Sequence, residues 1–199
     1  TYGELVRLYE EGVLDFSRVT SFNLDEYVGL PKSHPESYYA FMHRNLFDRI
    51  NIRETHLPDG QAEDLTGECR KYDEAIRKAG GVDLQLLGIG SNGHIGFNEP
   101  SDRFVYGTNV INLTESTISA NRRFFDSADE VPRRAVSMGI GTIMSARSIL
   151  LLAMGAQKAD AIKAMMEDEV DPRIPASILR THPSVTVLLD KAAAGGLSL

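Results

Sequence analysis

Short apolar runs alternate with longer helical patterns along this chain, and this alternation limits the possible fold more than any other feature. The apolar runs span residues 18–22, 82–89, 109–113, 135–138, 148–154 and 184–189. Their lengths suit buried strands, whereas the segments between them repeat apolar residues every three or four positions, as amphipathic helices do. Strands that alternate with helices predict an α/β fold with a mostly parallel sheet.

Four segments have enough helical spacing to predict an inward face. The expected helices begin at Thr1, near Pro35, near Leu65 and after Gly155, with Pro35 in a first turn, where proline is favoured. The expected inward residues are Leu5, Leu8 and Tyr9; Tyr39, Met42, Leu46 and Ile50; Leu65, Cys69, Tyr72, Ile76 and Ala79; and Ala159, Ile162 and Met166. Cys69 is therefore expected to pack in the core, and not to act as a reactive thiol or form a disulfide.

Composition limits the classes of function. The chain has 199 residues, 42% of them hydrophobic, and a formal net charge of −7. The sequence also shows no linker and no internal repeat, so one domain over residues 1–199 is expected. An acidic chain lacks the basic face that nucleic acid and anionic membranes require, so neither is an expected partner. No run reaches the ~18 apolar residues of a membrane span, and the single cysteine suits a reducing compartment, so a cytoplasmic location is expected.

The stretch GIGSNGHIGFNEP, residues 88–100, contains Gly88, Gly90 and Gly93 in the spacing of a dinucleotide-binding loop. A nicotinamide site would also need a helix after the third glycine and an acidic residue about 20 positions further on, for which Glu115 is the candidate. Residues 94–107 hold too many glycine, proline, asparagine and aspartate residues for that helix. A nicotinamide site is therefore not expected.

The same stretch brings His94 close to Glu99 in sequence. Imidazole titrates near neutral pH and a carboxylate can fix its tautomer, so the pair predicts proton transfer; a histidine that only caps backbone groups is the alternative. Asp25 and Glu26 follow another apolar run, and neighbours in an extended segment point to opposite faces, so one is expected to be catalytic and the other structural. A metal site from Asp25, His94 and Glu99 lacks the usual ligand spacing and is not expected.

An anionic ligand of so acidic a chain needs a local cation. Arg122 and Arg123 are candidates, of which one is expected at the surface and one inward, and Lys158 is a third. Lys158 falls in the first turn of its expected helix, where backbone amides and the ammonium could hold an anion together. A solvated side chain is the alternative for Lys158.

Four segments resemble the signature segments of the glucosamine-6-phosphate deaminase family, in order along nearly the whole chain. They are NLDEYVGLPKSHPESYY at residues 23–39, GHIGFNEP at 93–100, NRRFF at 121–125 and GAQK at 155–158. The resemblance implies a Rossmann-like three-layer α/β/α fold and a reaction without cofactor or metal, in which glucosamine 6-phosphate and water give fructose 6-phosphate and ammonia. Such an isomerising hydrolase serves amino-sugar catabolism, including N-acetylglucosamine degradation.

The resemblance also implies roles for individual residues. The implied catalytic residues are Asp25, His94, Glu99 and Asn92, and the implied substrate-binding residues are Glu26, Arg123, Lys158 and Gly93. Asp25 would move a proton between C2 and C1 of the open-chain sugar through an enolamine. His94, assisted by Glu99, would open the pyranose ring, and Arg123 and Lys158 would hold the phosphate.

The chain departs from the family's pattern in three places, two of which concern individual residues of expected binding or catalytic sites. Some members have Asp where this chain has Asn92, so Glu99 is expected to be the only charged partner of His94, with Asn92 contributing hydrogen bonds. The activator-phosphate positions of regulated members correspond here to Asp102, Asn109 and Ile111. Compared with the regulated members, this chain has an additional acidic residue and lacks two cations at these positions. We therefore expect no activation by N-acetylglucosamine 6-phosphate. A monomer or small homo-oligomer is expected.

A third departure concerns the start of the chain. The family normally begins with a strand, a helix, a second strand and a phosphate loop, about 30 residues or more, ahead of the helix expected at Thr1. The given sequence does not contain that unit. A domain that is incomplete at its N-terminus is therefore expected.

Three other functions stay open. A hydrolase like 6-phosphogluconolactonase would share the fold and a Gly-His motif, although residues 25–27 and 97–100 favour the deaminase. A deaminase of the galactosamine epimer is a closer variant. A non-catalytic sugar-phosphate sensor, as in related domains of transcriptional regulators, should carry a DNA-binding segment and could dispense with Asp25 and His94.

Overall fold

The structure, a computed structural model, describes residues 1–125 and 127–198. The chain forms two compact units: the first comprises Thr1–Glu68 and Asn112–Val136, and the second comprises Cys69–Ile111 and Ser137–Leu199. Both contain helices and strands. The expectation of a single domain over residues 1–199 stays a prediction.

Short elements make up the first unit. Its helices are α1 (Tyr2–Glu10), α2 (Tyr38–Asn45) and α4 (Glu115–Asn121), with the 3₁₀ turns η1 (Phe47–Arg49), η2 (Arg122–Phe124) and η3 (Ala128–Glu130). Strand β1 (Thr20–Phe22) pairs in parallel with β3 (Glu54–His56). Strand β2 (Asp25–Tyr27) pairs with β6 (Arg134–Ser137) in a second sheet. Strand β5 (Asn109–Asn112), the third strand of that sheet, has most of its residues assigned to the second unit.

A small hydrophobic core joins α1 and α2. Val6 of α1 is 1% exposed and packs with Met42, Leu46 and Phe47, and Leu5 lies at the margin of this cluster. The predicted helix at the start of the chain is confirmed. Its most buried side chain is Val6, which was not among the predicted inward residues.

Helix α2 begins later than the sequence predicted. Its N-cap residue is Ser37, and not a residue that would place Pro35 in the first turn; Ser37 Oγ accepts a hydrogen bond from Ala40 N at 3.0 Å. A serine hydroxyl satisfies one of the amides that a first turn leaves free. The helix ends before Leu46 and Ile50, which reach the core from the segment that follows it.

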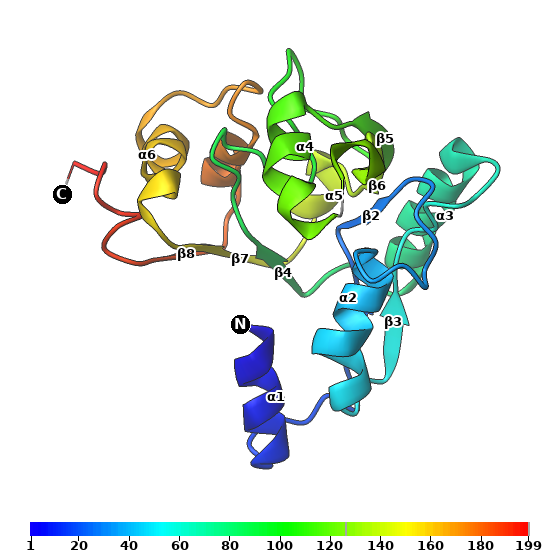
Figure 1. The fold of residues 1–199 in the computed structure, drawn as a ribbon. Coiled ribbons are helices and arrows are strands. Elements are labelled where there is room, and N and C mark those ends of the chain that lie inside the picture. Colours follow the sequence, from blue (N-terminus) through cyan, green and yellow to red (C-terminus); the bar gives the residue numbers. More distant parts are fainter. Residues whose placement is uncertain (126, 199) are drawn as a thin grey trace. The chain divides into compact units, whose positions relative to one another are not determined.

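A parallel three-stranded sheet organises the second unit (Figure 1). Its order is β4 (Leu84–Leu87), β7 (Ser148–Ala153) and β8 (Val185–Leu189). Leu87 lies opposite Leu151, and Ala153 lies opposite Leu189, so the carboxyl ends of the three strands share one edge. Ligands of parallel sheets gather at that edge, which directs attention to the segments after β4, β7 and β8.

Helices complete the second unit. They are α3 (Leu65–Lys78), which begins in the first unit, α5 (Ile140–Met144) and α6 (Ala159–Glu167), with the 3₁₀ turns η4 (Ala156–Lys158) and η5 (Pro175–Thr181). On α3 the predicted inward residues Cys69, Tyr72 and Ile76 are buried. Cys69 is a free, buried cysteine, so the prediction that it packs in the core is confirmed.

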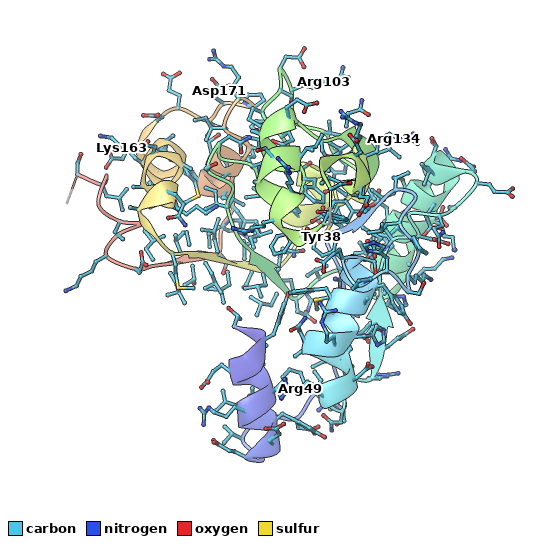
Figure 2. The ribbon with its side chains drawn as sticks, in the orientation of Figure 1. Tyr38, Arg49, Arg103, Arg134, Lys163 and Asp171 are labelled. Carbon is cyan, nitrogen blue, oxygen red and sulfur yellow. The ribbon has the colours of Figure 1, made fainter. Side chains whose placement is uncertain are left out.

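The inward face of α6 is rotated from the predicted one. The buried residues of this helix are Ala161, Ile162 and Met165. The prediction was correct for Ile162 and wrong for Met166, which is 42% exposed, whereas Ala159 is only partly buried. Two adjacent methionines lie 100° apart around a helix, so either could have faced the core. Lys163 of the same helix is exposed (Figure 2).

Every predicted apolar run overlaps a strand. The structure adds β2 and β3, which were not predicted because their sequences, DEY and ETH, are mostly polar. Among the residues that the structure describes, no helix combines the length and the apolar character needed to cross a membrane.

Candidate active site

The glycines after β4 form a tight turn around an imidazole. Gly90 N donates to His94 O at 2.8 Å, and Gly93 N donates to Gly90 O at 3.1 Å. A Cβ on Gly90 would lie 2.4 Å from the His94 ring. Residues 94–107 contain no helix, as the sequence predicted. The turn therefore lacks the helix N-terminus that a dinucleotide pyrophosphate requires.

His94, Glu99 and Asn92 form a cluster in this turn. Nδ1 of His94 lies 3.5 Å from Glu99 Oε2, with the side chains 23% and 7% exposed. Asn92 Nδ2 donates to the same Glu99 oxygen at 2.9 Å, and Asn92 Oδ1 accepts from His94 N at 3.2 Å. Asn92 thus contributes hydrogen bonds to both partners, as the sequence predicted.

One atom of this cluster is unusual. Among the described residues, His94 Nδ1 is the buried side-chain nitrogen or oxygen atom that lacks a hydrogen-bond partner. It faces Glu99 Oε2 at a distance just longer than a good hydrogen bond. Catalytic hydrogen bonds are often long before substrate binds, so this spacing suits an acid–base pair.

Asn98 fixes the far side of the turn. The side chain is 6% exposed, and Nδ2 donates to Ile95 O and to Met138 O, both at 2.9 Å. Next to it, Phe97 N donates to Ser137 Oγ at 3.1 Å. Sequence reasoning missed these positioning residues. The polar Ser137 within the apolar run 135–138 was the available signal.

Gly93 needs to be glycine for two reasons. Its φ of +84° lies in the left-handed region, and a Cβ would come within 2.8 Å of Ile174 Cγ2. Its carbonyl accepts a hydrogen bond from Ala176 N at 2.9 Å. The start of η5 and the residue before it therefore hold Gly93, which directly precedes His94.

Glu26 of β2 is buried and serves the backbone. It is 4% exposed and accepts hydrogen bonds from Tyr27 N at 2.8 Å, Tyr38 N at 3.0 Å and Tyr39 N at 2.9 Å. Burial raises the pKa of its carboxyl, although the three amides act against that rise. Asp25 is only partly buried. Of the two neighbouring carboxylates, Glu26 has the structural geometry, and its part in substrate binding stays a prediction.

Tyr27 connects β2 to the end of α4. Its hydroxyl accepts a hydrogen bond from Asn121 Nδ2 at 3.1 Å, and its ring stacks on Tyr38 at 5.3 Å between centroids. Burial raises the pKa of Tyr27 to about 12, so the phenol stays neutral. Asn121 directly precedes the arginine pair.

Both arginines of that pair are exposed. Arg122 and Arg123 lie in η2, none of whose residues is buried. The prediction that one points inward was wrong, because a single 3₁₀ turn without apolar anchors has no inward face. The Arg123 guanidinium lies 4.7 Å from the Phe124 ring centroid.

Lys158 ends the turn η4 and serves as the N-cap residue of α6. It therefore follows β7, as the glycine turn follows β4, at one edge of the same sheet. The structure thus brings Asn92, Gly93, His94 and Glu99 into one cluster within the second unit. Asp25, Glu26 and Arg123 belong to the first unit. Within the described part of the chain, no group of three or more His, Cys, Asp or Glu side chains is placed to hold a metal ion.

Known proteins match nearly the whole chain. A family model described as glucosamine-6-phosphate isomerases/6-phosphogluconolactonase matches residues 1–188. The glucosamine-6-phosphate deaminase of Thermoanaerobacter pseudethanolicus is 55% identical over 97% of this chain and 77% of the relative. That of Clostridium perfringens strain SM101 is 54% identical, over 97% of this chain and 81% of the relative.

Solved structures match as well. A monomeric glucosamine-6-phosphate deaminase superposes with a TM-score of 0.95 at 44% identity, covering 98% of this chain and 82% of that one. The 6-phosphogluconolactonase of Trypanosoma brucei has a TM-score of 0.67 at 24% identity, over 100% of this chain and 81% of that one, a likeness of fold alone. The predicted fold class, a Rossmann-like three-layer α/β/α arrangement with a mostly parallel sheet, is confirmed.

Proposed function

The chain belongs to the family of glucosamine-6-phosphate isomerases and 6-phosphogluconolactonases, and from that premise we infer that it converts glucosamine 6-phosphate and water into fructose 6-phosphate and ammonia. The observation that carries this inference is the high identity to curated deaminases over nearly all of the chain. The lactonases share the fold at much lower identity. A reaction of this kind would serve amino-sugar catabolism.

The His94–Glu99 pair suits the first step of that reaction. The pyranose opens when a proton leaves the C1 hydroxyl and another reaches the ring oxygen. One imidazole near neutral pH can carry out both transfers, and Glu99, 3.5 Å away, can stabilise the imidazolium that forms in between. Asn92 is assigned to this step because it holds the carboxylate oxygen that faces the imidazole.

Asp25 is assigned to the isomerisation. Its carboxylate removes the proton from C2 of the open-chain aldehyde, which gives an enolamine, and returns a proton to C1. The resulting imine at C2 adds water and releases ammonia, which leaves fructose 6-phosphate. One carboxylate suffices, because the two carbons are neighbours and the same base takes and gives the proton.

Arg123 and Lys158 are assigned to the phosphate. Arg123 offers an exposed guanidinium, which can bind phosphate oxygens in pairs, and Lys158 stands at the N-terminus of α6, where the helix dipole favours an anion. Gly93 lets the backbone approach the sugar closely. Glu26 is assigned an indirect part, through the strand that carries Asp25.

We expect the partner to be a small sugar phosphate and the protein to act as a monomer or small homo-oligomer. The similar solved structure is described as a monomeric deaminase, which supports the monomer. The acidic balance of the chain argues against nucleic acid and anionic membranes as partners and fits a cytoplasmic enzyme.

The test is ammonia release from glucosamine 6-phosphate by the protein and by Asp25→Asn. The wild type should release ammonia, and Asp25→Asn should lose about a thousandfold in kcat while still binding the sugar phosphate. A sugar-phosphate sensor would bind equally well in both forms and release no ammonia in either.

A further inference from the structure

Asp190 is the first residue after β8, and it ties together the ends of two neighbouring strands. Its carboxylate accepts a hydrogen bond from Gly155 N, at 3.1 Å to Oδ1 and 3.0 Å to Oδ2, and one from Ala193 N at 2.7 Å. Gly155 stands just after β7, the strand that pairs with β8. One side chain therefore links the turn after β7 to the turn after β8.

The linked turn is the one that ends in Lys158. Gly155 has a φ of +92°, which a side chain would strain, and its carbonyl accepts a hydrogen bond from Lys158 N at 3.0 Å. The amide of Gly155 is held by Asp190 on one side, and its carbonyl is held by Lys158 on the other. The position of Lys158 at the edge of the sheet thus depends on how Gly155 is held.

We propose that Asp190 is a positioning residue for the substrate phosphate, which it serves by holding Gly155 so that Lys158 is presented at the carboxyl edge of the sheet. The proposal rests on the proposed function, in which Lys158 holds the phosphate. Asp190 touches no reacting atom in this account. Its effect is on binding, and not on the chemical step.

The charge of Asp190 is compatible with an anion site nearby. The backbone amides of Ala193 and Gly155 lower the pKa of its carboxyl, so it is ionised at neutral pH. Hydrogen bonds from those amides partly offset its negative charge. A carboxylate engaged in this way can shape a phosphate site without drawing the ammonium of Lys158 away from it.

The test is Asp190→Asn, measured by steady-state kinetics and by competitive inhibition with inorganic phosphate. The amide keeps the shape and one acceptor oxygen but loses the charge. We expect the KM for glucosamine 6-phosphate and the Ki of phosphate to rise about tenfold, and kcat to stay within about twofold. A merely structural residue would lower the active fraction and leave KM and Ki unchanged, and that result would overturn the proposal. Both constants are independent of how much enzyme is active.

Asp15→Asn is the matched control. Asp15 is an exposed carboxylate that accepts hydrogen bonds from Ser17 N at 3.0 Å and Asn51 Nδ2 at 2.7 Å, in a turn that carries no assigned site residue. Its replacement should leave KM and Ki unchanged. A rise equal to that of Asp190→Asn would contradict the proposal, because it would show that any such carboxylate matters.

A double-mutant cycle with Lys158→Ala identifies the route of the effect. If Asp190 acts through Lys158, Asp190→Asn should add no further rise in the Ki of phosphate once Lys158 is alanine. Additive rises, or no effect of Lys158→Ala, would overturn the proposal. A wild-type protein that binds phosphate but forms no ammonia would instead refute the proposed function, and the phosphate titration would still test Asp190.

Discussion

Asn92 is the residue on which the geometry of the acid–base pair depends. Its amide donates to the Glu99 oxygen that faces His94, and its carbonyl oxygen accepts from the His94 backbone. We expect Asn92→Ala to lower kcat about tenfold with little change in KM, because a hydrogen bond to a charged group is lost where proton transfer occurs. Steady-state kinetics would measure both constants.

Asn109→Ala is the control for this prediction. The Asn109 amide also donates within the second unit, to Gly107 O at 3.0 Å, but outside the glycine turn. Its replacement should leave kcat close to the wild-type value. Equal losses in the two variants would mean that Asn92 acts through general stability.

At the scale of single residues, the sequence predicted which residue types the site contains better than it predicted what surrounds each of them. The closeness of His94 to Glu99 followed from a short glycine-rich stretch. The alternation of a strand predicted that Asp25 and Glu26 have different environments, but not which one is buried. That choice depends on the amides of Tyr38 and Tyr39, more than ten residues away, as the Asn98 contacts depend on residues 40 positions away.

At the scale of elements, Glu26 joins β2 to the start of α2. Its buried carboxylate accepts from amides of both elements, and burial raises its pKa above the ordinary value of 4.5. The folded state therefore binds this proton more tightly than the unfolded chain does. Glu26 makes its whole contribution to the free energy of unfolding below pH 4.5. That contribution is lost as the pH rises through the raised pKa of the folded state.

Glu26→Gln tests that sign. The difference in free energy of unfolding between the wild type and Glu26→Gln should favour the wild type most at about pH 4. It should shrink as the pH rises toward about pH 7. Urea unfolding across this range would measure it, with Glu63→Gln, an exposed glutamate, as the control. A relative stability that grows with pH would mean that the amides outweigh burial.

Helices and strands were predicted correctly where the pattern of apolar residues is enough to define them. Strand β7, with its alternating burial, was predicted correctly, as were Cys69, Tyr72 and Ile76 on α3. The prediction of Ala79 as an inward residue was wrong, because it lies beyond the end of α3 and is exposed. Strands β2 and β3 were missed because hydrogen bonds to neighbouring strands, and not apolar side chains, define them. The start of α2 was misplaced because the Ser37 cap depends on the local backbone. Which face of α6 is buried depends on tertiary packing, and the sequence does not show which of the two adjacent methionines faces the core.

At the scale of the whole molecule, we expect this chain to lack the activator regulation of some family members. Asp102 is exposed, and the Asn109 amide is bound to Gly107 O, where an activator phosphate would need cations. We expect a hyperbolic rate curve for glucosamine 6-phosphate that N-acetylglucosamine 6-phosphate leaves unchanged. A sigmoidal curve that this compound makes hyperbolic would refute the prediction.

The division into two units had no signal in the sequence. Composition and charge run evenly along the chain, whereas the units are defined by contacts between segments far apart in sequence. The fold class was predictable, because strand and helix patterns alternate throughout. The membership of each site residue in one unit or the other was not.

The central claim is that this chain deaminates and isomerises glucosamine 6-phosphate with Asp25 as the base. The most direct measurement is the amount of ammonia and of fructose 6-phosphate that the purified protein forms from this substrate, with 6-phosphogluconolactone as the competing substrate. The account predicts equal amounts of the two products, a rate about a thousandfold lower with Asp25→Asn, and no turnover of the lactone. Lactone hydrolysis without ammonia release would contradict it.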